Sequence, residues 1–167
     1  LAARIYLEIL KNKNAPVLTE PSPGRLLETL VDVASDVEAL PYPRVLAVQA
    51  LQKLCQQHPK LAQNQLLQAP NGLHRLGDLL QTGQDEQVRN EALLLAGYLA
   101  KWPAIAKVWM FSEVGDVVIQ LAMEEGGLTR GNMVVLDSLL LLHNMLRHDA
   151  ALADLVFQSP TMAPQLA

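Results

Sequence analysis

The chain has 167 residues, of which 50% are hydrophobic and only 4% aromatic, a composition typical of packed helices more than of β-sandwiches. Its 13 basic and 17 acidic residues give a net charge of −4 without a lysine-rich run, so no nucleic-acid partner is expected. Cys55 is the only cysteine, which excludes an intrachain disulfide and fits a reducing compartment such as the cytoplasm. No uncharged apolar stretch approaches the ~20 residues that cross a bilayer, so any membrane contact is expected to be peripheral.

The first segments are predicted to be a helix and a loop. Apolar residues recur at helical spacing over residues 1–11. Three prolines and a glycine then make residues 12–24 the expected flexible loop, because they forbid a continuous helix. The chain starts without a helix cap or an initiator methionine, which suggests a piece of a longer protein.

Two helices are predicted next, from Arg25 to Leu40 and, after the helix-stopping Pro41-Tyr42-Pro43, as far as His58. Beyond this point short, medium and long helices recur in that order. They are expected over residues 59–67, 72–81 and 85–101, then over 103–111, 113–125 and 132–147, with a further short helix over 149–157.

This recurrence has a measurable period. His58-Pro59 maps onto Trp102-Pro103 after 44 residues, and Trp102 maps onto His148 after 46. A period of about 40–47 residues marks arrays of two or three helices, and the trio favours the armadillo type. The sequence therefore predicts an all-α protein, a right-handed α-solenoid of armadillo-type repeats that forms a single domain over residues 1–167, with roughly three and a half repeats.

The long helices explain why an array is needed. Ten of the fourteen residues over 133–146 are apolar, and they surround most of the helix instead of forming one stripe. Such a helix must be covered on several sides, so neighbouring repeats are expected to stack and to leave a concave face.

No residue pattern indicates catalysis or a cofactor. The chain lacks a Gly-rich phosphate loop, a His-Glu-x-x-His sequence and a nucleophile elbow. Its four histidines lie far apart in the repeat scheme or on different helical faces, so no metal site is predicted. Without a paired nucleophile and base, an enzyme is disfavoured.

Two polar residues in the last long helix are the best candidates for a binding surface. Asp137 and Asn144 are seven apart and therefore lie about 20° from one line along the helix. A shift of 46 residues maps them onto Glu91 and Tyr98. A row of such positions across the long helices would line a groove; the alternative is that these groups bond to neighbouring backbone.

Several stretches within residues 68–158 resemble the head domain of the general vesicular transport factor family, the golgin-type Golgi vesicle tethers. They are Val88-Arg89-Asn90-Glu91 with the three leucines after it, Glu124-Glu125-Gly126 with Gly131, and a Val-Val pair followed by Asp137 and Asn144. The chain departs from the family in two places. Its loop over 12–24 is short and proline-rich instead of acidic, and after Arg147 it lacks an Asn/Gln- and Phe-rich stretch.

The resemblance implies an armadillo-like, non-enzymatic head that precedes a dimeric coiled coil. Such a protein holds transport vesicles in ER-to-Golgi and intra-Golgi transport, engages Rab GTPases, SNAREs and other tethering factors, and is cytoplasmic and peripheral on Golgi and vesicle membranes. The residues it suggests for protein binding are Arg89, Asn90, Glu91, Glu124, Glu125, Gly126, Gly131, Asp137 and Asn144.

Two other armadillo functions are the alternatives. A peptide-groove nuclear import adaptor carries a Trp four residues before a groove Asn, whereas Leu140 precedes Asn144 here. An Hsp70 cofactor that releases nucleotide would be separated from a tether by a nucleotide-release assay.

Overall fold

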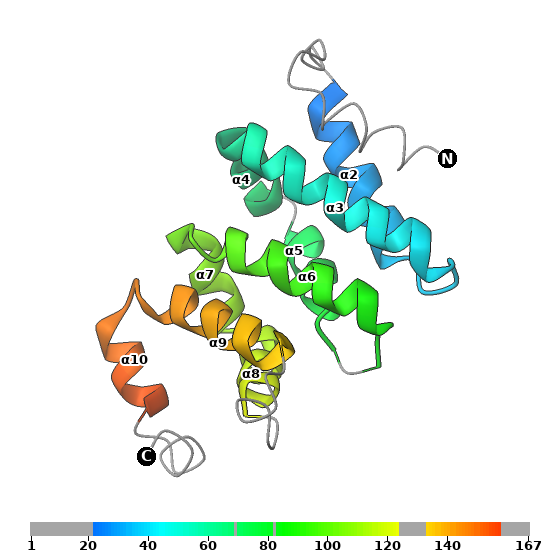
Figure 1. Ribbon diagram of the computed structural model, residues 1–167. Coiled ribbons are helices and arrows are strands. Elements are labelled where there is room, and N and C mark those ends of the chain that lie inside the picture. The colour runs from blue at the N-terminus through cyan, green and yellow to red at the C-terminus, as the bar shows by residue number, and fades with distance from the viewer. Residues whose placement is uncertain (1–21, 69, 82, 124–132, 158–167) are drawn as a thin grey trace.

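The computed structural model describes residues 22–68, 70–81, 83–123 and 133–157. Within these ranges the chain forms helices joined by turns, without a strand (Figure 1). The predicted all-α class is therefore confirmed for the described residues. The helices are α2 (Ser22–Ser35), α3 (Pro41–Gln57), α4 (Pro59–Gln68), α5 (Pro70–Asp78), α6 (Glu86–Leu99), α7 (Pro103–Met110), α8 (Glu113–Ala122), α9 (Met133–Leu146) and α10 (Ala150–Phe157).

Prolines open several of these helices. Pro41 and Pro103 stand in the first turns of α3 and α7, where a missing N–H leaves no intrahelical bond unmade. The expected stop at Pro41-Tyr42-Pro43 is therefore wrong, since these residues begin α3. Residues 22–24, expected to end the loop, instead form the first turn of α2, while the expected helix over 1–11 and the rest of that loop lie outside the described residues.

Side chains set other helix ends. Helix α2 stops at Ser35 and not at the predicted Leu40, because Asp36 Oδ1 accepts a hydrogen bond from Glu38 N at 3.1 Å, a local turn that competes with the helix. At the start of α6, Asp85 Oδ1 accepts from Gln87 N and Val88 N at 3.0 and 3.2 Å, which satisfies two otherwise unpaired donors.

The long helices α3, α6 and α9 lie side by side in that order and run in the same direction (Figure 1). Helix α3 packs on α6, and α6 packs on α9. Apart from Ala106 and Val135, the buried apolar side chains of α2 to α9 belong to one continuous core. Each long helix and the two helices before it form one unit. The unit of α7, α8 and α9, with 8, 10 and 14 residues, has the predicted short, medium and long order. In the unit of α4, α5 and α6, with 10, 9 and 14 residues, only the long third helix agrees with that prediction. The winding of the units about a common axis stays a prediction.

The two helices that precede α9 contact a helix of the preceding unit, since both α7 and α8 touch α5. Trp109 of α7 is 1% exposed, and its Nε1 donates a hydrogen bond to Leu73 O of α5 at 3.2 Å. Gly77 of α5 lies so close to Val114 of α8 that a Cβ at position 77 would collide with the valine side chain. Successive units are therefore in contact through their interiors and not only through their ends.

None of the helices that the structure describes has the length and apolar character needed to cross a membrane. Cys55 of α3 is buried, and desolvation raises the pKa of its thiol to about 12. The thiol therefore stays protonated and packs as a small apolar group.

Candidate protein-binding groove

A groove of about 410 Å³ crosses the outer face of α3, α6 and α9. All three helices contribute side chains to it, among them Gln52 and Gln56 of α3, Leu94 and Tyr98 of α6, and Asp137 and Leu140 of α9. The groove follows from the stacking of the long helices, since each one presents the same face to the outside.

The apolar part of the groove consists of two equivalent leucines. Leu94 and Leu140 are 46 residues apart, the same shift that relates α6 to α9. Their side chains are 51% and 56% exposed, although both helices are otherwise packed into the core. An exposed apolar pair inside a groove is typical of a surface that binds another protein.

Asn144 does not offer its side chain freely to a partner. It is only 4% exposed, and its Nδ2 donates to Gly97 O of α6 at 3.2 Å. The equivalent residue of α6, Tyr98, donates its hydroxyl to Cys55 O of α3 at 3.3 Å. This position of each long helix thus ties it to the backbone of the preceding one, which is the alternative that the sequence left open.

Glu91 is also engaged within the protein. Gln49 Nε2 donates to Glu91 Oε1 at 2.8 Å, and Gln52 Nε2 donates to Glu91 O at 2.9 Å and to Oε2 at 3.3 Å. No sequence pattern singles out these glutamines, because their role depends on the register between α3 and α6.

Asp137 differs from Glu91, its equivalent one unit earlier. Its carboxylate is half-buried, and desolvation raises its pKa above the ordinary value. Among the described residues none donates a hydrogen bond to it or pairs with it. Removing this partly desolvated carboxylate further from water would be unfavourable without a partner, so a cationic or hydrogen-bonding group of a ligand would stabilise it.

The other charge in the groove is positive. Lys101 is exposed just beyond the end of α6, and its Nζ lies 5.6 Å from the ring centroid of Tyr98. Tyr98 in turn meets Trp102 edge to face, with ring centroids 5.6 Å apart. The Tyr98 ring thus places the ammonium at the end of the groove opposite Asp137.

Comparison with known proteins relates the chain to intracellular transport proteins, whereas no family model matches it. It is 30% identical over 125 residues to the intracellular protein transport protein USO1 of Saccharomyces cerevisiae, covering 74% of this chain and 7% of the yeast protein. It is 34% identical over 103 residues to the general vesicular transport factor of Homo sapiens, covering 61% and 10% of the two chains. Golgin candidate 6 of Arabidopsis thaliana is 35% identical over 99 residues, with coverage of 59% and 10%.

This chain carries a region of the general vesicular transport factor type. The resemblance seen in the sequence is thereby confirmed. The matched segment spans a tenth or less of the length of these relatives.

The remaining residues suggested by the resemblance to the general vesicular transport factor are not found in the groove among the residues that the structure describes. Arg89 and Asn90 are half-buried in the first half of α6, where Arg89 Nε and Asn90 Oδ1 are buried without a hydrogen-bond partner. Glu124, Glu125, Gly126 and Gly131 lie outside the described residues. Of the nine suggested positions, only Asp137 and Asn144 line the groove.

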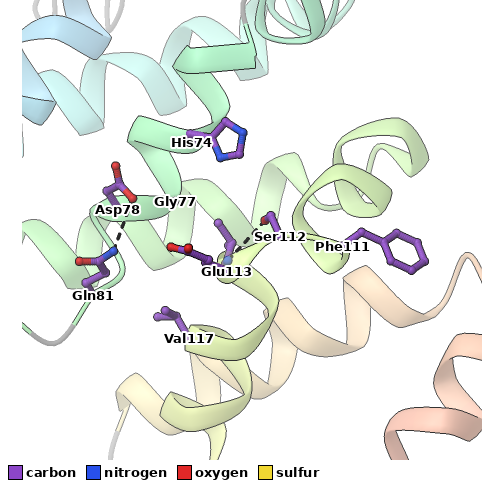
Figure 2. Close-up of a pocket in the computed structure, with 9 residues that line it drawn as sticks. His74, Gly77, Asp78, Gln81, Phe111, Ser112, Glu113 and Val117 are labelled. Atoms are coloured by element: carbon purple, nitrogen blue, oxygen red, sulfur yellow. Dashed lines mark hydrogen bonds between the residues drawn. The ribbon is translucent and has the colours of Figure 1, made fainter.

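A second cavity, of about 330 Å³, lies between α5 and the junction of α7 with α8. Figure 2 shows His74 and Asp78 on α5, with Phe111 and Glu113 across from them. Asp78 accepts a hydrogen bond from Gln81 Nε2 at 3.5 Å. In the ranges that the structure describes, no group of three or more His, Cys, Asp or Glu side chains could hold a metal ion.

Proposed function

We propose that the helices form a right-handed armadillo-type solenoid in which each trio of short, medium and long helices is one repeat, forming a single domain over residues 1–167. Three observations support this arrangement. The long helices α3, α6 and α9 pack successively and in the same direction. One core runs through all units, and the equivalent residues Tyr98 and Asn144 make the same kind of bond to the preceding long helix. Repeat proteins are built from units that pack against their neighbours in this way.

We further propose that the chain is the protein-binding head of a vesicle-tethering factor in ER-to-Golgi and intra-Golgi transport, and that it is not an enzyme. The single observation that carries this proposal is its identity of 30–35% to a protein transport protein of yeast, a golgin candidate of Arabidopsis thaliana and a human general vesicular transport factor. The groove across α3, α6 and α9 supplies an exposed surface on which such a head can bind proteins.

The partners we propose are Rab GTPases, SNAREs and other tethering factors, bound by a full-length homodimer that is peripheral on Golgi and vesicle membranes. Leu94, Leu140 and Asp137 are the groove residues we assign to contact with a partner. Arg89, Asn90 and Glu91, together with the turn from Glu124 to Gly131, are proposed as adjoining contacts. Asn144 is proposed to position α9 against α6, because its amide is already engaged.

The test is a vesicle-docking assay in which the chain competes with the resident tether. ER-derived vesicles are mixed with Golgi membranes, and docking is measured while purified chain is added in excess. We expect the chain to inhibit docking, since it would occupy partners without linking two membranes. A variant Leu140→Asp should inhibit far less, because a charge in the apolar part of the groove opposes binding.

The matched control is Leu40→Asp, which places the same charge on a leucine that is 75% exposed in the turn between α2 and α3. This variant should inhibit docking as strongly as the unaltered chain. Absence of inhibition by the folded chain, together with no binding to purified Rab GTPases or SNAREs, would overturn the proposed function.

A further inference from the structure

The groove has an ordered distribution of apolar and charged groups. Leu94 and Leu140 form its apolar centre, Asp137 lies toward the amino ends of the long helices, and Lys101 lies at their carboxyl ends. Met133 and Leu136, which are also exposed, continue the apolar surface along α9. Positions 133, 136 and 140 follow the i, i+3, i+7 spacing of one helical stripe.

The two charges are separated by a helical distance. Asp137 corresponds to position 91 of α6 after the shift of 46 residues, and Lys101 is ten residues beyond that position. At 1.5 Å per residue, ten residues of a helix span about 15 Å. A second helix that lies along α6 and α9 would therefore meet both charges with side chains ten positions apart.

The polar groups of the groove favour a helical ligand over an extended one. An extended segment needs partners for its backbone N–H and C=O groups when it is removed from water. In this groove the amide of Asn144 is bonded to Gly97 O, and that of Gln52 is bonded to Glu91. A helix satisfies its own backbone, so it can cover the leucines without these amides.

We propose that the groove binds an amphipathic helix of a partner protein, with a lysine or arginine toward Asp137, apolar side chains over Leu94 and Leu140, and a carboxylate toward Lys101. This inference rests on the proposed function and specifies the chemistry of its partner. Two charges of opposite sign fix the direction of the bound helix, because the reversed orientation would place like charges together.

The probe is a blocked, alanine-based helical peptide of about 18 residues, long enough to be partly helical in water. It carries an arginine, leucines three and seven positions later, and a glutamate ten positions after the arginine. The matched control peptide has glutamine in place of both the arginine and the glutamate, because a peptide with the two charges merely exchanged could bind in the reversed direction. Binding of both to the complete chain is measured by fluorescence anisotropy, with helix content of the chain checked by circular dichroism.

We expect the first peptide to bind about tenfold more tightly than the uncharged control, as two partly desolvated ion pairs allow. In the protein variant Asp137→Lys, which leaves two positive charges in the groove, the preference should disappear, because either direction of binding then places like charges together. Leu140→Asp should abolish binding of both peptides, whereas Leu40→Asp should leave it unchanged.

Equal affinity for the two peptides, or no saturable binding of either, would overturn the proposal. So would concentration-dependent self-association in sedimentation experiments that Leu140→Asp removes, since the groove would then be a contact between two copies of the chain. The peptide assay needs no vesicles. Its failure therefore leaves the docking result standing. Failure of docking inhibition and of binding to Rab GTPases and SNAREs, with intact peptide binding, would overturn the proposed function alone.

Discussion

Gly77 provides the most direct probe of the contact between units. A Cβ at this position of α5 would collide with the side chain of Val114 on α8. Valine in a helix has one strongly preferred rotamer, so α8 must shift to make room. Overpacking of this kind costs about 1–3 kcal/mol, while alanine in place of helical glycine returns about 0.5–1 kcal/mol. Gly77→Ala is therefore expected to lower the free energy of unfolding by about 1–2 kcal/mol.

A double-mutant cycle isolates this contact. Val114→Ala alone removes two carbon atoms from a buried site and should cost about 1.6 kcal/mol. Combined with Gly77→Ala it removes the collision, so the double variant should be about 1–2 kcal/mol more stable than the sum of the single effects predicts. The measurement is urea unfolding followed by circular dichroism.

Gly97→Ala is the matched control, because a Cβ at this position of α6 meets no atom within 4 Å. This change should be neutral or stabilise the protein by about 0.5–1 kcal/mol. The reasoning is refuted if Gly77→Ala behaves like Gly97→Ala, or if the effects of Gly77→Ala and Val114→Ala simply add.

Three further outcomes are expected. Trp109→Phe should destabilise the protein by about 1–3 kcal/mol in urea unfolding, because the buried hydrogen bond from the indole to Leu73 O and part of the packed volume are lost; an unchanged midpoint would contradict this. The Cys55 thiol, with a pKa of about 12, should not react with a disulfide reagent at neutral pH until urea unfolds the chain, and rapid reaction of the native protein would disprove its burial. The pKa of Asp137 is raised in the folded state, so the folded protein holds the proton of this carboxyl more tightly than the unfolded chain does. The stability that Asp137 contributes therefore falls as the pH rises from the ordinary pKa of 3.8 through the folded pKa. Asp137→Asn should therefore gain stability relative to the unaltered chain between acid and neutral pH, and a pH-independent difference would refute this cause.

Helix positions could be predicted from the sequence because they depend on neighbouring residues. The expected helix over 103–111 is observed as Pro103–Met110, and the one over 85–101 as Glu86–Leu99. Errors arose where one residue permits two local outcomes. Pro41 can end one helix or begin the next, and the turn at Asp36 depends on a side-chain bond that periodicity does not reveal.

The groove could be predicted only in part. Helical spacing placed Asp137 and Asn144 on one line, and both line the groove. The sequence could not distinguish their roles, because the bond from Asn144 to Gly97 O depends on the register between α9 and α6. The leucines at 94 and 140 were missed as surface residues for a related reason. In a helix that is apolar nearly all round, composition does not reveal which side stays exposed.

Hydrogen–deuterium exchange of the chain, alone and bound to a partner captured in the docking assay, tests the central claim most directly. We expect protection of backbone amides in α6 and α9 around Leu94 and Leu140, with little change in α5 and α8. Protection confined to the turn between α2 and α3 or to the second cavity, with α6 and α9 unchanged, would contradict the assignment of the groove as the surface that binds proteins.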